Sequence, residues 1–247
     1  GGSHVRLEAT GFGLIYFLVD MLETADDAIE DKRILISGAG NVALHAARKA
    51  AELGGKVLTL SSSDGLLYAE DGLEADAIDT ALHGDKRSGE ALRALADDGR
   101  GEWRDGETPW SIEADVALPC ATQNELGGDD ARQLADSGCA FVAEGANMPC
   151  TADALRVFDE ARIHHAPGKA SNPGGVALSG LEMHQNASFI SLPYDELDVQ
   201  LRAIMQRIHT QCCEHGRDRD GFIHYRRGAN IAAFTRVTQA LLAQGVG

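Results

Sequence analysis

Apolar residues follow two alternating patterns along this chain. Short continuous apolar runs bounded by Gly, Pro, Ser or Asp are typical of buried strands, and longer segments with apolar residues three and four positions apart are typical of amphipathic helices. The short runs predict strands at 34–36, 56–60, 115–118, 140–143 and 163–166. The longer segments predict helices at 12–22, 41–53, 73–82, 88–96, 129–137 and 152–161.

The order of these elements predicts the fold class. Strands that alternate with helices indicate an α/β fold, a doubly wound and mostly parallel sheet of the Rossmann-like kind. The remainder is predicted to be helical, at 174–187, 194–215 and 227–244. We therefore expect a dinucleotide-binding domain at 1–190 and additional C-terminal helices at 191–247 that pack back on it. A turn is expected at 61–65 and a polar linker at 99–109.

A glycine-rich turn joins the first predicted strand to the helix that follows. Its sequence, Gly-Ala-Gly-Asn-Val-Ala at 38–43, matches what a dinucleotide pyrophosphate requires. Gly38 allows a sharp turn, Gly40 lets phosphates approach bare backbone, and the first amides from Asn41 and Val42 onward face the anion. An ordinary glycine-rich turn is the alternative. The strand at 56–60 completes a strand–helix–strand unit, which favours a cofactor.

The end of the second predicted strand bears on the choice of coenzyme. An acid usually stands there to bind the ribose 2′-hydroxyl of NAD, whereas this chain has Ser61 and Ser62. Hydroxyl groups can donate to the 2′-phosphate of NADP. Lys86 and Arg87 are candidates to pair with that phosphate, or they are simply a solvated surface pair. These residues favour NADP, and Asp64 keeps NAD possible.

Composition and charge exclude several classes of partner. The chain has 247 residues, 44% hydrophobic, and a formal net charge of −16, which argues against nucleic acid and anionic membranes as partners. It has neither an apolar run of about 18 residues nor a signal-peptide pattern at its start. The cysteines are five in number and form no metal-type doublets, so we expect reduced thiols in the cytoplasm. His164 and His165 have no carboxylate or cysteine at ligand spacing, so no metal is expected.

Five motifs in order give the chain a specific resemblance. They are Arg-Leu-Glu-Ala-Thr-Gly-Phe-Gly at 6–13, Gly-Ala-Gly-Asn-Val-Ala at 38–43, Ala-Leu-Pro-Cys-Ala-Thr-Gln-Asn-Glu at 117–125, Ala-Glu-Gly-Ala-Asn-Met-Pro at 143–149 and Ala-Pro-Gly-Lys-Ala-Ser-Asn-Pro-Gly-Gly-Val-Ala-Leu-Ser-Gly-Leu-Glu-Met at 166–183. Together they resemble the cofactor domain of hexameric glutamate dehydrogenases, most closely the short-subunit, NADP-linked bacterial type.

The resemblance implies roles for individual residues. Thr10 and Asn41 would lie beside the nicotinamide, Asn147 would contact its ribose, and Asn172 would approach the nicotinamide or the substrate. Val176 and Ser179 would meet the substrate, with the Ser179 hydroxyl donating to its side-chain carboxylate. The expected cofactor residues are Thr10, Gly38, Gly40, Asn41, Val42, Ser61, Ser62, Lys86, Ala121, Thr122, Asn147 and Asn172. The alternatives are that Thr10 and Asn147 cap helices and that Ser179 only sits on a helix face.

The resemblance also implies an activity and an incomplete active site. The parent enzyme would convert L-glutamate to 2-oxoglutarate and ammonia, and the reverse, by hydride transfer, and would be a homohexamer. Its catalytic lysine and aspartate would belong to an N-terminal substrate domain absent from this chain, so no catalytic residue and no activity are expected in the chain alone. The alternatives are a branched-chain or aromatic amino-acid dehydrogenase, against which Ser179 argues, and a non-catalytic NADP-binding module.

Overall fold

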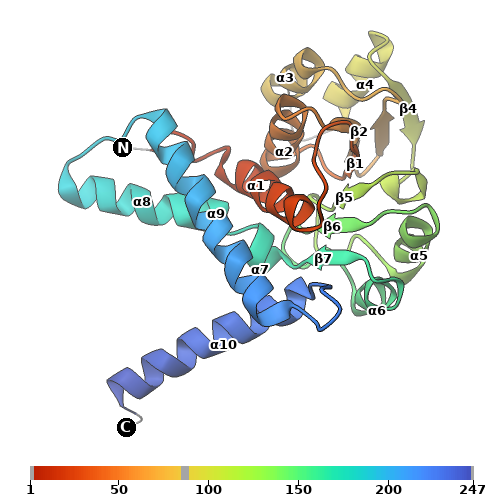
Figure 1. The fold of residues 1–247 in the computed structure, drawn as a ribbon. Helices are drawn as coiled ribbons and strands as arrows, with labels where there is room; N and C mark the ends of the chain where they lie inside the picture. Colours follow the sequence, from red (N-terminus) through yellow and green to blue (C-terminus); the bar gives the residue numbers. More distant parts are fainter. Residues whose placement is uncertain (1–2, 85–88, 246–247) are drawn as a thin grey trace.

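A single mixed sheet organises the computed structural model, which describes residues 3–84 and 89–245 (Figure 1). In the described residues the sheet has seven strands in the order β4-β3-β2-β1-β5-β6-β7. The strands are β1 (Arg33–Ile36), β2 (Lys56–Ser62), β3 (Gly65–Tyr68), β4 (Glu102–Asp105), β5 (Val116–Leu118), β6 (Phe141–Ala143) and β7 (His164–Ala166). The helices are α1 (Ala9–Thr24), α2 (Asn41–Glu52), α3 (Ala75–His83), α4 (Glu90–Asp97), η1 (Pro109–Ser111), α5 (Gly128–Asp136), α6 (Ala152–Ala161), α7 (Gly168–Ser171), α8 (Gly174–Ser188), α9 (Tyr194–Gly216) and α10 (Tyr225–Gln244).

Helices cover both faces of the parallel part of the sheet. β1 pairs in parallel with β2 and with β5, and β6 pairs in parallel with β5 and with β7. Side chains of a strand alternate between the faces, so Ile34 and Ile36 pack in the core under α1 and α2, whereas Leu35 packs with Leu134 of α5 and Phe158 of α6. The predicted doubly wound, mostly parallel α/β fold is confirmed.

Two strands were missed in the sequence, and both lie at one edge of the sheet. β3 pairs antiparallel with β2 and with β4, so the turn expected at 61–65 is shorter than predicted: β2 continues to Ser62, the turn is residues 63–64, and β3 begins at Gly65. The linker expected at 99–109 contains β4 instead. β4 reads Glu-Trp-Arg-Asp because an edge strand with no buried residue needs no apolar alternation, so its sequence looks like a loop.

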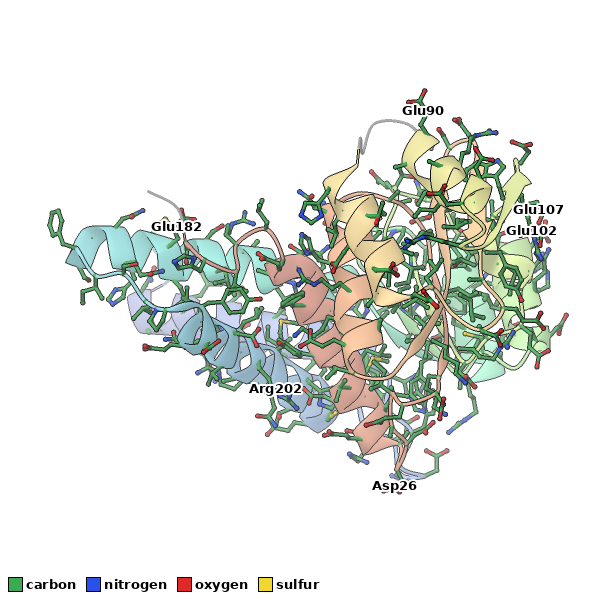
Figure 2. The ribbon with its side chains drawn as sticks, turned by 90° about the horizontal axis from the view of Figure 1, so that it is seen from above. Asp26, Glu90, Glu102, Glu107, Glu182 and Arg202 are labelled. Atoms are coloured by element: carbon green, nitrogen blue, oxygen red, sulfur yellow. The ribbon has the colours of Figure 1, made fainter. Side chains whose placement is uncertain are left out.

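The C-terminal helices all contact the body of the protein, α8 and α9 through α1 and α10 through β7. α9 packs against α1, and Leu197, Leu201 and Met205 join the core cluster beneath it. The hydroxyl of Tyr16 on α1 donates to the Asp198 carboxylate, at 2.7 Å. α8 and α10 instead extend away from the sheet, and Figure 2, viewed from above, shows Glu182 of α8 far from the strands (Figure 1).

The three C-terminal helices confirm those predicted there. α7 was not expected, because one short turn of helix carries no periodic signal. Within the described part of the chain, no helix combines the length and the apolar character needed to cross a bilayer.

Candidate functional site

The order of the strands places a cleft where two loops face each other. β2 and β5 flank β1 on opposite sides, so the chain reverses its winding between β1 and β5. Ligands of open α/β sheets bind beyond the carboxyl ends of the strands at such a point. Gly38 follows β1 with φ of +89°, and a Cβ built there would lie 3.1 Å from the Ala121 Cα in the loop after β5. This position therefore requires glycine, for its backbone angle and for the close approach.

Gly40 has a different reason to be glycine. Its φ of −85° suits any residue, and a Cβ built there would meet no atom within 4 Å. Gly40 is also the N-cap of α2, which begins without a side-chain cap. The helix start, with Asn41 exposed and Val42 half-buried, thus presents backbone to open space, where an anion benefits from the helix dipole.

Two serines hold the turn in place. The Gly38 amide donates to Ser61 Oγ at 2.9 Å, and the Cys120 amide donates to Ser37 Oγ at 2.9 Å. Ser61 is buried, and this bond gives its hydroxyl a structural role; direct contact of Ser61 with a cofactor stays a prediction. Ser37 was missed in the sequence, although a hydroxyl at the end of the strand before a glycine turn was the available signal.

A cavity of about 280 Å³ lies beside this turn, on the side of β2. Ser62 and Thr122 line it, as expected, together with Thr108, which the sequence did not single out. Its described lining includes the carboxylates of Glu107 and Glu125 and no Lys or Arg. Lys86 lies outside the described residues.

Glu125 organises the loop after β5. Its Oε1 accepts hydrogen bonds from the amides of Ala121, at 2.9 Å, and Thr122, at 3.2 Å. Burial raises the pKa of this carboxyl above its ordinary value, and the hydrogen bonds oppose that shift. Ala121 and Thr122 are consequently held exposed at the mouth of the cleft.

A second cavity, of about 430 Å³, lies on the side of β6 and β7. It brings together Asn147, Asn172 and Val176, which come from the loop after β6, the end of α7 and the start of α8. The Asn172 side-chain amide donates to the Gly145 carbonyl, which fixes its orientation. Lys169 also lines this cavity, and its ammonium donates to Asn230 of α10.

The start of α8 lies against the start of the chain. A Cβ at Gly175 would stand 2.4 Å from Thr10 Oγ1, so Thr10 is packed against α8. The Ser179 hydroxyl donates to the Gly175 carbonyl, at 3.1 Å, and accepts from Arg6 Nε, at 2.9 Å. The hydroxyl proton of Ser179 is thus already donated to a backbone carbonyl. Arg6, the cation beside this hydroxyl, was missed in the sequence. The signal was available, because a site for a carboxylate calls for a positive charge.

The cap alternatives for two residues are wrong. α1 begins after Glu8, so Thr10 lies inside the helix rather than at its cap. The helix that follows Asn147 is α6, and its cap is Thr151, whose hydroxyl accepts from the Ala154 amide. Neither Thr10 nor Asn147 is explained by capping.

Residues 1–245 match the model of the glutamate/leucine/phenylalanine/valine dehydrogenases. The chain belongs to this family. Two members similar over the whole chain are the NAD-specific glutamate dehydrogenase of Bacteroides fragilis, 47% identical, and the NADP-specific glutamate dehydrogenase of Psychrobacter sp. TAD1, 45% identical. The chain covers 56% of each of these relatives.

A solved structure from this family agrees with the fold over the whole chain. The glutamate dehydrogenase of Plasmodium falciparum matches with a TM-score of 0.94 and 38% identity, and the match covers 53% of that chain. The chain thus spans about half the length of the relatives that it matches.

Proposed function

We propose that this chain is the coenzyme-binding part of an NADP-dependent glutamate dehydrogenase. The observation that carries the proposal is the edge of the sheet, where the open backbone at Gly40 follows β1, with one cavity on the side of β2 and the other on the side of β6 and β7. A dinucleotide is long enough to need both cavities, with its pyrophosphate at the start of α2 and one nucleoside on each side. The family resemblance and the names of the relatives agree with this reading.

The residues of this edge fit the parts of the coenzyme. Asn147 and Asn172 offer amide groups to the nicotinamide end, and Thr10 and Asn41 flank it. Ala121 and Thr122 form the wall of the cleft opposite Gly38. The coenzyme supplies the hydride chemistry when bound, and the chain supplies binding and orientation.

The Arg6–Ser179 pair supports a substrate with a side-chain carboxylate. Arg6 uses only Nε in its bond to Ser179, and a guanidinium carries further N–H groups for a carboxylate. Ser179 holds the guanidinium in place, which differs from the direct donation expected from the sequence. An apolar substrate offers nothing to this cation, which disfavours the leucine- and phenylalanine-type enzymes. A non-catalytic NADP-binding module has no substrate carboxylate for this pair to bind, so the pair also disfavours that alternative.

The proposed preference for NADP rests on hydroxyl groups, because no Lys or Arg is among the described residues that line this cavity. Ser62 and Thr108 line the cavity on the side of β2, where the 2′-phosphate would lie. A Cβ built at Gly89 would lie 2.5 Å from Ser62 Oγ, and Lys86, three residues before Gly89 in sequence, remains our candidate to pair with that phosphate. NAD remains possible, because Glu107 stands in the same cavity and relatives of similar identity are named for both coenzymes.

The remaining parts of the proposal concern the longer protein. We infer that residues 1–190 form the dinucleotide-binding domain, that residues 191–247 are its C-terminal helices, and that an N-terminal substrate domain supplies a catalytic lysine and aspartate. The parent is proposed to be a cytoplasmic homohexamer acting on L-glutamate, 2-oxoglutarate and ammonium.

Calorimetric titration of the purified chain with NADPH and NADH tests the proposal. We expect NADPH to bind at least about tenfold tighter, since each hydrogen bond to a charged phosphate contributes roughly 1.5–3 kcal/mol.

Gly40→Ala, whose methyl group enters the open space before α2, should weaken NADPH binding about tenfold, or about 1.4 kcal/mol. Gly180→Ala is the matched control, because a Cβ there also meets no atom within 4 Å. Absence of dinucleotide binding contradicts the function, and equal affinities contradict only the coenzyme.

A further inference from the structure

Three buried side chains with metal-ligating atoms meet beside β6 and β7, behind the second cavity. Glu144 directly follows β6, Cys150 precedes α6, and His165 lies in β7. Their exposed fractions are 5%, 6% and 7%, and one ligand atom from each lies within 4.8 Å of the other two. Spacing along the chain predicts no metal, because no cysteine or carboxylate lies at ligand spacing from the histidines in sequence. The parallel pairing of β6 with β7 brings them together instead.

The neighbours of this trio hold it in an ordered arrangement. Glu144 Oε1 lies 3.1 Å from His165 Nε2, and Glu144 Oε2 accepts from the Gly168 amide at 2.7 Å. The His165 ring stacks on Phe158, which fixes its plane. Donor atoms that are already oriented by their surroundings make a metal site possible without rearrangement of the backbone.

We propose that Glu144, Cys150 and His165 bind a transition-metal ion, for which Zn²⁺ is the best fit. Sulfur, nitrogen and oxygen donors together suit Zn²⁺, whereas Ca²⁺ and Mg²⁺ require oxygen ligands. Zn²⁺ bonds of about 2.0–2.3 Å need the three atoms to close around the ion by small side-chain movements. On binding, the Cys150 thiol loses its proton to solvent. Zn²⁺ takes the place of the proton between His165 Nε2 and Glu144, and the neutral ring then carries its one proton on Nδ1.

The charge of the trio matches that of the ion. One carboxylate and one thiolate neutralise Zn²⁺, and the imidazole coordinates as a neutral ring, so burial of the complete site leaves no net charge. Glu144 also lines the cavity of about 430 Å³, from which water can occupy a fourth position.

Zinc titration of the chain tests this proposal independently of any coenzyme. The protein is stripped with a chelator, and ZnCl₂ is added in competition with a chromophoric chelator. We expect one tight Zn²⁺ per chain, weakened at least about 100-fold by Cys150→Ala and by His165→Phe, since even outer-shell changes cost 10–100-fold. Phenylalanine at 165 keeps the stacking on Phe158.

The control variants are other cysteines of the chain. Cys213 Sγ lies 3.5 Å from His209 Nε2 and forms a cysteine–histidine pair. Cys139 is a buried thiol. Cys213→Ala and Cys139→Ala should both leave zinc affinity unchanged. Loss of binding in Cys213→Ala, or retention of binding in both Cys150→Ala and His165→Phe, overturns the proposal.

X-ray absorption on the zinc-loaded, unmutated chain gives an answer even if those variants fail to fold. The expected spectrum has one sulfur at about 2.3 Å and nitrogen or oxygen ligands at about 2.0–2.2 Å. A zinc shell without sulfur, or a chain that binds no zinc, overturns the proposal.

Discussion

The strands and the C-terminal helices of this chain bury their apolar residues to very different extents. Every residue of β5 is buried, as is each of Ile34, Leu35 and Ile36 in β1. On α8 and α10, by contrast, Val176, Met183, Phe234 and Leu242 are largely exposed, with Phe234 at 72%. Both helices begin against the body of the protein, α8 at α1 and α10 at β7, and their far ends extend away from the sheet (Figure 1).

The difference separates a region that completes its own core from one that does not. Exposed apolar side chains gathered on one element mark surfaces that contact another molecule or domain. Relatives of the chain are nearly twice its length, so the proposed remainder of the protein is one source of such contacts. The sheet region should therefore fold as an independent unit. The outer parts of α8 and α10 should form one side of an interface whose other side is the remainder of the protein.

Glutamate dehydrogenase activity in the chain by itself would contradict this comparison most strongly. We expect coenzyme binding but no glutamate-dependent NADPH formation, because the proposed catalytic lysine and aspartate lie in the other half. Positioning alone contributes roughly 7–11 kcal/mol to such reactions, so the chain should be at least about 10⁵-fold slower than the longer protein. The assay compares the chain with and without a separately expressed N-terminal half. Turnover by the chain alone would point to Lys169, which lines the second cavity.

The same substitution in the two regions should have unequal effects on stability. Phe17 on α1 is fully buried and packs against the rings of His209 and Tyr225, so Phe17→Ala should lower the free energy of unfolding by about 3–5 kcal/mol. Phe234→Ala on α10 should change it by less than about 0.5 kcal/mol. Urea denaturation measures both.

Sedimentation supplies the second half of that test. The chain is expected to be monomeric or weakly associating, and Phe234→Ala should shift any association towards monomer. A large loss of stability in Phe234→Ala would mean that the core extends along α10 beyond Tyr225 and Ala229.

The same contrast explains what the sequence could predict. The central strands β1, β5 and β6 are short apolar runs because helices cover both sides of the sheet, so their pattern is unambiguous. β4 has no buried residue and consequently no pattern. The turn from Gly38 to Asn41 was predictable because its function depends on neighbouring residues of one segment.

Sites assembled by the fold were not predictable in that way. Arg6 meets Ser179 only because α1 packs beside α8, and Glu144 meets His165 only because β6 pairs with β7. The spacing of these residues along the sequence does not indicate that either pair is in contact. The family resemblance identified Ser179 but not what its hydroxyl contacts.

His209 offers a pH test of the buried side of α9. It lies 3.1 Å from the Tyr225 hydroxyl, and burial, followed by the charge of Arg217, lowers its pKa to about 4. The unfolded chain binds this proton below about pH 6.5 and the folded chain only below about 4, so stability should fall as the pH drops between these values, by about 2–3 kcal/mol. His209→Gln should remove that loss in denaturation curves measured across this range.

Asp20 acts in the opposite sense and provides the control. Burial, followed by the charge of Glu23, raises its pKa to about 6, so its ionised form destabilises the folded protein above that pH. Lowering the pH from about 6 relieves this cost and partly masks the effect of His209. Asp20→Asn should therefore make the acid loss steeper. A loss that is unchanged in His209→Gln would show that this histidine is not held neutral.

A modest loss of activity is predicted for Ser179, on the helix where the two regions meet. In the longer protein, Ser179→Ala should lower kcat/KM for glutamate about tenfold, or about 1.4 kcal/mol, because Arg6 loses the acceptor that orients it. NADPH affinity should be unchanged, and Ser188→Ala, at the exposed end of α8, serves as the matched control. Normal glutamate kinetics in Ser179→Ala would mean that the hydroxyl only packs the helix. The expected result would show that the two parts of α8 have different roles. Its first turns, which contact Arg6 and Thr10, belong to the site at the edge of the sheet. Only its outer turns belong to the surface that we expect to contact the remainder of the protein.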